Sequence, residues 1–297
     1  MIYIVIPVHN RRHYTIGCLA CLSRQTITAQ QVIVVDDGST DGTTEQIRSS
    51  FSDVVVLPGD GSLWWAGATN LGIRYVLQTF NPGDDDFILT LNDDTTIDTT
   101  YLESLLSAYQ AHKPCIVGSV SVDVKAPQRL LYAGTRLNLL IPDIENWAET
   151  RFKNRYDRLK TTAPYLLSDS LPGRGMFIPR AVFDRIGFFD EQRFRHHMAD
   201  LDFSVRARRA GFPLVVSASS VVHEFTDATG VNLQSPMSLR AFIEALSAIK
   251  SPINYRTRYH FAVKHARLPY AYFTVDMLRI LLGYLRRQLN VISRQSQ

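Results

Sequence analysis

The feature that most constrains the fold of this chain is an alternation of short apolar runs with helical patterns over its first 115 residues. The apolar runs lie at 2–8, 31–35, 54–57 and 87–91. Amphipathic, helix-like stretches separate or follow them at 13–25, 43–51, 68–79 and 99–110. Strands that alternate with helices in this way form a mostly parallel sheet with flanking helices. We therefore predict an α/β fold.

Polar residues cluster where each of these four runs ends. The clusters are His9-Asn10, Asp36-Asp37, Gly59-Asp60-Gly61 and Asn92-Asp93-Asp94. In an open parallel sheet the carboxyl ends of the strands share one edge, and ligands bind in the crevice beside that edge. The sequence therefore predicts one site to which all four clusters contribute.

The Asn92-Asp93-Asp94 triplet is the most chemically specific of these clusters. Two adjacent carboxylates beside a buried strand need a counter-charge. A divalent cation supplies it and in turn attracts a diphosphate, and Mg²⁺ and Mn²⁺ both favour such oxygen ligands. The alternative is an acidic, solvated turn, which the other three clusters make the weaker interpretation. Asp36 is placed to accept a hydrogen bond from a base N–H or a ribose hydroxyl.

The pattern becomes irregular after Cys115. We expect strands near 116–122 and 130–135, followed by a mobile loop or helical insert at 143–162. Residues 171–178 are predicted to form a glycine-rich turn that runs into an apolar strand. Two helices (181–186 and 200–210) and two strands (213–217 and 221–222) precede His223, and from Pro236 on the sequence is helical.

Six of these segments resemble, in chain order, the family-two glycosyltransferases of the GT-A fold, including bacterial surface-polysaccharide (rhamnosyltransferase-like) members. They are Val5-Ile-Pro-Val-His-Asn10, Val34-Val-Asp-Asp-Gly-Ser-Thr-Asp41, Gly67-Ala-Thr-Asn-Leu-Gly-Ile73, Leu89-Thr-Leu-Asn-Asp-Asp94, 177–190 and 200–211. Each motif alone is weak, but six in the right order are highly specific. The resemblance implies a GT-A catalytic domain over 1–225, with a nucleotide-sugar-binding half at 1–115 and an acceptor and catalytic half at 116–225. A basic, amphipathic helical extension follows at 226–297.

The resemblance also implies roles for matching positions. Asp200 is expected to deprotonate an acceptor hydroxyl, and Asp94 to bind the Mn²⁺ or Mg²⁺ ion that bridges the donor diphosphate. Asp93 is expected to contact ribose or metal, and His223 to complete the metal shell. Direct displacement would invert the anomeric configuration. The nucleotide is expected to contact Pro7, Val8, His9, Asn10, Asp36, Asp37, Asn70 and Asp93.

Two positions depart from the family pattern. Ala199 stands where the family usually has Glu, so an acceptor contact made by that Glu would need another group here. Asn92 replaces the first acid of the D-x-D-type motif and is expected to position its neighbours. Asp202, two residues after the expected base, is predicted to be structural and to pair with Arg206.

Further residues are candidates for the donor-sugar or acceptor end of the site. Trp65 can stack on a sugar or a base, although core packing is equally consistent. Arg174, beside Gly175 in the glycine-rich turn, can meet a phosphate or the acceptor, or serve ordinary turn chemistry. His197 can bind the acceptor, although a loop role is favoured. For His223, a structural role and a ligand role are about equally supported.

Composition sets the expected class and location. The chain is 45% hydrophobic and 20% charged, as in ordinary soluble globular proteins. No apolar run approaches the ~20 residues of a membrane span, and residues 1–7 lack the features of a signal peptide. Three cysteines suggest a reducing compartment, and Cys18 and Cys21 are interpreted as core residues. We expect a cytoplasmic protein.

The C-terminal part has a different charge. Residues 250–297 carry nine Lys and Arg against one acid, whereas the preceding residues carry 23 against 27. Polar residues between 272 and 294 recur at spacings of three and four, which predicts one Arg-rich and one apolar helix face. Such a helix lies on a membrane surface or docks on the catalytic domain or a second subunit. Both a peripheral position on the inner membrane face and a homodimer contact are therefore expected alternatives.

The predicted function is transfer of a sugar from a nucleotide-diphosphate sugar to a hydroxyl of a glycan or lipid-linked oligosaccharide, with no nucleic-acid partner. A sugar-phosphate nucleotidyltransferase would need a glycine-rich loop after the first strand, where this chain has Pro7-Val-His-Asn-Arg-Arg12. A non-catalytic nucleotide-sugar-binding module is the other alternative, favoured by Ala199 alone. The motifs do not specify the sugar, the nucleotide base or the linkage.

Overall fold

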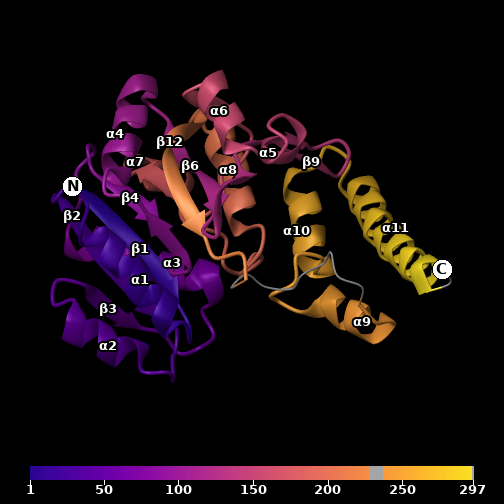
Figure 1. The fold of residues 1–297 in the computed structure, drawn as a ribbon, viewed down its shortest axis with the longest axis horizontal. Coiled ribbons are helices and arrows are strands. Elements are labelled where there is room, and N and C mark those ends of the chain that lie inside the picture. Colours follow the sequence, from indigo (N-terminus) through magenta and orange to yellow (C-terminus); the bar gives the residue numbers. More distant parts are fainter. Residues whose placement is uncertain (228–236, 296–297) are drawn as a thin grey trace.

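The computed structural model describes residues 1–227 and 237–295, and within them the chain forms a ten-stranded sheet, a small hairpin and flanking helices (Figure 1). The strands are β1 (Ile2–Val8), β2 (Gln30–Asp36), β3 (Val55–Pro58), β4 (Phe87–Thr90), β5 (Thr95–Ile97), β6 (Ile116–Asp123), β7 (Ala126–Tyr132), β8 (Thr135–Asn138), β9 (Asp143–Asn146), β10 (Tyr165–Ser168), β11 (Met176–Pro179) and β12 (Leu214–Glu224). The helices are α1 (Arg12–Leu22), α2 (Thr43–Ser50), α3 (Trp64–Thr79), α4 (Tyr101–His112), α5 (Trp147–Thr150), α6 (Tyr156–Thr162), α7 (Ala181–Ile186), α8 (Ala199–Arg209), α9 (Leu239–Ser247), α10 (Tyr255–His265) and α11 (Pro269–Gln295).

The predicted parallel sheet is confirmed for the N-terminal strands, which run in the order β3-β2-β1-β4. Their register aligns the strand ends, because Val8 lies opposite Asp36 and Asp36 lies opposite Pro58. The polar residues that follow these strands therefore emerge at one edge of the sheet. This is the arrangement that the sequence predicted for its polar clusters.

The second half of the sheet is mixed rather than parallel. β11 runs antiparallel to both β4 and β6, so Met176 lies beside Thr90. This register carries the glycine-rich turn before β11 to the edge where β4 ends. The two strands predicted at 213–217 and 221–222 are one strand, β12, whose register against β6 shifts between Ser217 and Val221.

Two hydrophobic cores cover the two faces of the sheet. Alternate residues of β1 enter them: Ile4 and Ile6 pack into the core that includes α1 and α4, whereas Tyr3 and Val5 pack into the core that includes α3, α7 and α8. Cys18 and Cys21 are buried in the first core, which confirms their interpretation as packing residues.

The stretch at 143–162, predicted as a loop or helical insert, contains the short helices α5 and α6 but begins as strand β9. β9 pairs antiparallel with β8, and the hairpin that they form is called here the β8–β9 hairpin (residues 135–146). The backbone N–H of Arg267 donates to the carbonyl of Leu139, so the hairpin contacts the turn between α10 and α11.

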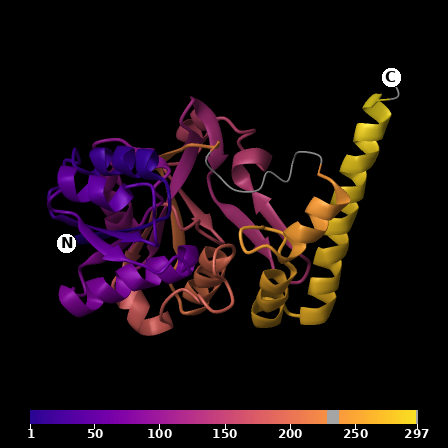
Figure 2. The same ribbon diagram turned by 90° about the horizontal axis from the view of Figure 1, so that it is seen from below.

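The helices predicted after Pro236 are confirmed as α9, α10 and α11. α10 docks on α8 through His265, whose Nε2 lies 2.7 Å from Oδ1 of the buried Asp202. α9 packs on α11, where the rings of Phe242 and Tyr284 stack with centroids 4.2 Å apart. Figure 2 shows α11 along the side of the molecule far from the N-terminal strands. Within the described ranges, none of the helices has both the length and the apolarity to cross a membrane.

Candidate active site

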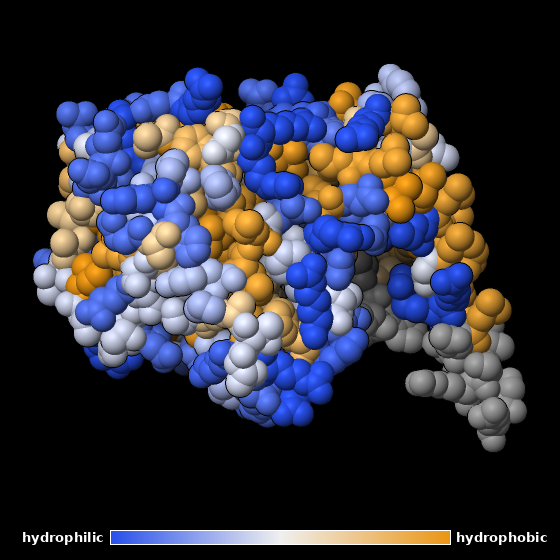
Figure 3. All heavy atoms as spheres, turned by 90° about the horizontal axis from the view of Figure 1, so that it is seen from above, coloured by the Kyte–Doolittle hydropathy of each residue, from blue (hydrophilic) through white to orange (hydrophobic). Residues whose placement is uncertain are grey.

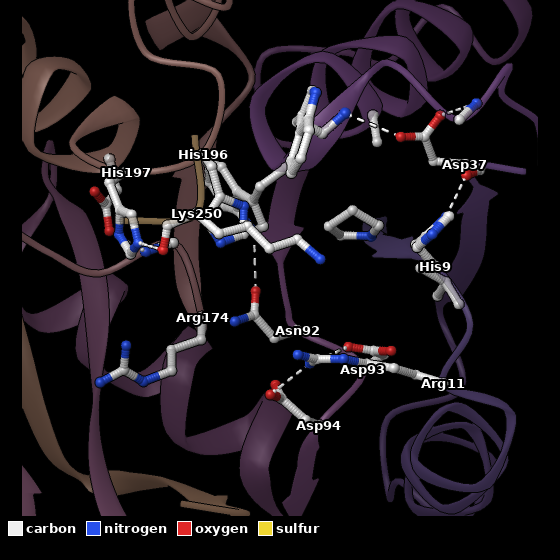
Figure 4. Close-up of a pocket in the computed structure, with 18 residues that line it drawn as sticks. His9, Arg11, Asp37, Asn92, Asp93, Asp94, Arg174, His196, His197 and Lys250 are labelled. Atoms are coloured by element: carbon white, nitrogen blue, oxygen red, sulfur yellow. Dashed lines mark hydrogen bonds and ion pairs between the residues drawn. The ribbon is translucent and has the colours of Figure 1, made fainter. Parts of the chain in front are cut away.

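A pocket of about 540 Å³ opens where the carboxyl ends of β1 and β4 meet the turn before β11 and the start of α8 (Figure 4). A volume of this size fits a small-molecule ligand or cofactor. Most of the residues singled out from the sequence contribute to it. Its lining includes Pro7, Val8, His9, Asp37, Trp65, Asp93, Asp94, Arg174, His197 and Asp200.

Asp93 and Asp94 follow β4 and are both only 4% exposed. Burial, together with the charge of Asp94, raises the pKa of Asp93 to about 7. Arg11 supplies counter-charge, because its Nη1 lies 2.7 Å from Oδ2 of Asp94 and 3.4 Å from Oδ1 of Asp93. Sequence reasoning missed Arg11, although it directly follows the first polar cluster.

Asn92 positions an aromatic side chain rather than a cation. Its Oδ1 accepts a hydrogen bond of 3.0 Å from Nε1 of Trp65. The Trp65 ring meets Phe189 edge-on and lies so close to Gly173 that a Cβ there would be 2.1 Å from it. Trp65 is thus held between the core and the glycine-rich turn, with part of it lining the pocket.

Asp37 organises the loop that leads into α3. Its carboxylate accepts hydrogen bonds from the backbone N–H groups of Gly61 (2.8 Å) and Trp64 (2.9 Å). Gly59 has no Cβ, which leaves room for this carboxylate: an added Cβ would lie 2.6 Å from its Oδ1. The carbonyl of Asp37 also lies 2.6 Å from Nδ1 of His9, so the ends of β1 and β2 are joined at the pocket wall.

Five predicted site residues do not line the pocket: Asn10, Asp36, Asn70, Gly175 and His223. Asp36 accepts from the backbone N–H of Ser39 and from the Thr44 hydroxyl, on the α2 side of the loop. Asn10 accepts from the backbone N–H of Thr40. Both residues therefore hold the loop that follows β2.

Asn70 and Gly175 also lie outside the pocket lining. Asn70 is fully buried and donates to the carbonyl of Phe189 (2.8 Å) and to Glu191 (2.7 Å), which ties α3 to the 187–191 segment. Gly175 has φ +80°, and an added Cβ would lie 2.5 Å from the Ser119 hydroxyl. It is required for the turn into β11 rather than for a ligand contact.

Asp200 lies in the first turn of α8 and faces the pocket. Its Oδ2 accepts from the backbone N–H of Gly173 (3.1 Å), and its Oδ1 from that of Leu201 (2.8 Å). Ala199 is fully buried in the core, so a Glu side chain in its place would put a charge there. The two backbone N–H groups therefore position the carboxylate of Asp200, and no acidic residue at position 199 takes part.

Asp202 has the structural role predicted for it. It accepts from Nε of Arg206 (2.8 Å) and also contacts Lys264 and His265 at 2.7 Å each. Burial alone would raise its pKa, but the hydrogen bonds from His265 and Lys264 and the charge of Arg206 outweigh burial and hold the pKa at about 2.

His223 does not face the pocket. It alternates along β12 with Glu224, whose side chain forms an ion pair with the pocket residue Arg174. The Nε2 of His223 is buried without a hydrogen bond, 3.8 Å from Asp98. Across residues 1–227 and 237–295, no group of three or more His, Cys, Asp or Glu side chains is arranged to hold a metal ion. A metal at Asp93 and Asp94 would therefore need further ligands from the substrate.

The C-terminal extension reaches the pocket through Lys250, which sequence reasoning also missed. Its Nζ lies 5.6 Å from the centroid of the Trp64 ring, and its carbonyl accepts from Nε2 of His197 (3.0 Å). His196 completes this group, and burial, with the charges of His197 and Lys250, lowers its pKa to about 4. His196 therefore contributes a neutral polar group at neutral pH, and burial also lowers the pKa of His197.

An α/β sheet with paired carboxylates at a strand end and a further carboxylate at a helix start across one pocket is the arrangement of a GT-A-type transferase. The family model described as Glycosyl transferase family 2 matches residues 3–176, and this chain belongs to that family. It is therefore a glycosyltransferase, as the sequence predicted.

Two relatives illustrate the range of the family. The chain is 25% identical over 227 residues to the N-acetylglucosaminyl-diphospho-decaprenol L-rhamnosyltransferase of Mycobacterium tuberculosis, covering 71% of this chain and 72% of that protein. It is also 25% identical over 189 residues to the low-salt glycan biosynthesis hexosyltransferase Agl10 of Haloferax volcanii, covering 60% of this chain and 53% of that protein.

Solved structures confirm the fold. Residues 1–349 of S. aureus TarS, in complex with UDP-GlcNAc, align with a TM-score of 0.57 at 16% identity, covering all of this chain and 92% of that one. GalNAc-T7 with UDP, GalNAc and Mn²⁺ aligns with a TM-score of 0.62 at 14% identity, covering 89% and 50%. The chain spans 43% of a longer TarS chain. At these identities the likeness shows the GT-A fold alone.

Proposed function

We propose that this glycosyltransferase transfers a sugar from a nucleoside-diphosphate sugar to a hydroxyl of a lipid-linked glycan, with inversion at the anomeric carbon. The observation that carries the proposal is that one pocket brings together Asp93, Asp94 and Asp200 from distant parts of the sequence. Paired carboxylates suit the diphosphate end of a donor, and a separately held carboxylate suits a general base.

The nucleoside is expected to lie at the β1 and β2 side of the pocket. Pro7, Val8 and His9 line that wall, together with Asp37. Asn10, Asp36 and Asn70 support the surrounding loops, and in this proposal they act through those loops. The complexes of TarS with UDP-GlcNAc and of GalNAc-T7 with UDP support a nucleotide sugar as ligand of the shared fold.

The carboxylate oxygens of Asp93 and Asp94 are suitable ligands for a hard divalent cation. Two buried carboxylates plus diphosphate oxygens and water form a common Mg²⁺ environment, and GalNAc-T7 was solved with Mn²⁺. Asp94 and Asp93 would hold Mn²⁺ or Mg²⁺, which would offset negative charge on the leaving nucleoside diphosphate. Arg11, Arg174 and Lys250 add positive charge at the same pocket.

Asp200 is the proposed base. The backbone N–H groups of Gly173 and Leu201 orient its carboxylate and leave lone pairs for a substrate hydroxyl. As the acceptor oxygen forms its bond to the anomeric carbon, the hydroxyl proton passes to Asp200. The bond from that carbon to the diphosphate oxygen breaks at the same time, and the diphosphate leaves on the opposite face.

The acceptor is expected at the side of the pocket that is lined by Trp64, His196, His197 and Lys250. The similar rhamnosyltransferase from M. tuberculosis has a lipid diphosphate acceptor in its name. A lipid-linked acceptor here would place the enzyme in polysaccharide biosynthesis at the inner face of the cell membrane.

The test is a transfer and donor-hydrolysis assay over a panel of nucleoside-diphosphate sugars with Mn²⁺ or Mg²⁺. We expect Asp200→Asn to bind donor as wild type does and to lose turnover by about 100-fold or more. Asp94→Asn is expected to lose donor affinity as well. Asp98→Asn, which alters an exposed aspartate outside the pocket, is the matched control. Donor binding without turnover in the wild type on every acceptor would instead identify a non-catalytic binding module.

A further inference from the structure

Exposed large apolar side chains are concentrated in one part of this molecule. Among the described side chains, 18 large hydrophobic residues are exposed, and all but Met1 and Leu167 belong to the β8–β9 hairpin or follow residue 238. Figure 3 shows hydrophobic residues gathered over the side of the molecule that α11 forms. An exposed cluster of this kind marks an interaction surface.

α11 has two apolar faces rather than the single one that the sequence predicted. Ile280 and Tyr284 are buried in a small core shared with α9, and Tyr272 is buried in the larger core that includes α8 and α10. The same buried face carries Asp276, which contacts Arg258 (2.5 Å) and Arg279 (2.9 Å). The internal packing of the helix is therefore already satisfied by one face.

The second face remains exposed along the helix, with residues at spacings of three and four. Its side chains are between 43% and 65% exposed. They form a stripe roughly 120° wide, since residues at these spacings share one side of a helix. We call this stripe the apolar ridge: Val275, Leu278, Leu281, Leu282, Leu285 and Leu289.

Other exposed apolar residues adjoin the ridge. On α9, Phe242 packs against Tyr284 of α11, while Leu239 and Ile243 remain exposed. At the other end, the β8–β9 hairpin contacts the turn before α11 and exposes Leu140 and Ile141.

The charge of this region favours an anionic partner. Residues 239–289 carry nine Lys and Arg and two acids. Both acids are paired internally, Glu244 with Arg240 and Asp276 with Arg258 and Arg279. Arg267 and Arg286 are exposed beside the apolar residues. A second copy docked ridge to ridge would bring arginines together without carboxylates on these helices to pair with them, which disfavours a homodimer.

We propose that the apolar ridge, with the exposed residues of α9, docks on an anionic lipid bilayer. The leucines enter the boundary of the acyl chains, and the arginines contact lipid phosphates. Lys250 lies between α9 and α10 and lines the pocket, so the pocket is joined directly to the helices that dock on the bilayer. Docking would help catalysis only if the acceptor is lipid-linked, as in the proposed function. The docking itself does not depend on that proposal.

The test is co-sedimentation of the full chain with vesicles of phosphatidylcholine alone or mixed equally with phosphatidylglycerol. We expect binding to the mixed vesicles that weakens as salt is raised. The triple variant Leu278→Gln, Leu282→Gln, Leu285→Gln is expected to bind at least about 100-fold more weakly, because each inserted leucine contributes roughly a tenfold factor. Arg286→Gln should weaken binding to the mixed vesicles and leave binding to the phosphatidylcholine vesicles unchanged.

Leu167→Gln is the matched control, because this leucine is 68% exposed on β10, outside the surface. Circular dichroism and donor hydrolysis in solution should be unchanged in all variants. The proposal is overturned if wild type does not bind the mixed vesicles, or if it forms a dimer that the triple variant abolishes while vesicle binding is absent. Vesicle binding by a chain without transferase activity would refute the proposed function and leave the docking proposal standing.

Discussion

The junction between α8 and α10 makes a strong prediction about stability. Asp202 is fully buried and contacts Arg206, Lys264 and His265. Replacing it with Ala removes the buried carboxylate that Arg206 and Lys264 contact, and it leaves Nε2 of His265, which has almost no access to water, without this partner. Removal of one partner from a buried ion pair costs about 3–5 kcal/mol. We therefore expect the free energy of unfolding of Asp202→Ala to fall by about that amount.

Urea unfolding followed by circular dichroism measures this change. Asp157→Ala is the matched control, because Asp157 also pairs with an arginine, Arg155, but at an exposed site. The control should leave the free energy of unfolding unchanged within error. A loss of less than about 1 kcal/mol in Asp202→Ala would refute the argument that this buried cluster joins the extension to the catalytic domain.

The same residue predicts an acid dependence. The pKa of Asp202 is about 2 in the folded protein, below its ordinary value of 3.8. A carboxylate with a depressed folded pKa contributes stability that is present above the unfolded pKa and lost as pH falls through the folded value. The contribution, about 2 kcal/mol, should therefore disappear between about pH 4 and pH 2. Asp202→Ala should lack this component of acid unfolding.

Three further predictions concern the pocket. Gly173→Ala should lower transfer activity and cost about 1–3 kcal/mol of stability, because the added methyl group meets Trp65. Gly83→Ala is the control: its methyl group meets no close neighbour, so transfer activity and stability should both be unchanged. Lys250→Ala should weaken nucleoside-diphosphate binding by about tenfold in calorimetry, whereas Lys160→Ala, which removes a cation over the Tyr156 ring outside the pocket, should not. The pKa of Asp93 is about 7, so protons should compete with Mn²⁺ for this carboxylate and Mn²⁺ affinity, measured by titration, should fall as pH drops below about 7. If the affinity did not change between pH 8 and pH 5, the role given to Asp93 would be contradicted.

Local sequence patterns predicted the helices and strands of the N-terminal half well, because the spacing of apolar residues and the turn-forming residues determine secondary structure within a few positions of the chain. Element ends were less well predicted. α4 begins at Tyr101 and has no side-chain cap, whereas the predicted helix began at residue 99. α3 begins at Trp64, before the predicted start at residue 68, because Asp37 holds the backbone N–H of Trp64 from a different strand.

Residues that depend on long-range contacts were beyond sequence reasoning. Arg11 lies 82 and 83 positions from the carboxylates that it contacts, and Lys250 reaches the pocket from the extension. His223 and Glu224 differ by one position, and only the register of β12 decides that Glu224 faces Arg174. Asn70 matched a family motif, yet its side chain is used to hold the 187–191 segment.

The central claim, that this pocket performs an inverting displacement with Asp200 as base, is tested most directly by the anomeric form of the released sugar. Proton nuclear magnetic resonance can follow hydrolysis of a nucleoside-diphosphate sugar, with water in place of the acceptor, before the product mutarotates. The account predicts that the first product has the configuration opposite to that of the donor, and that Asp200→Asn abolishes its formation. A first product with the configuration of the donor, or an unchanged rate in Asp200→Asn, would contradict it.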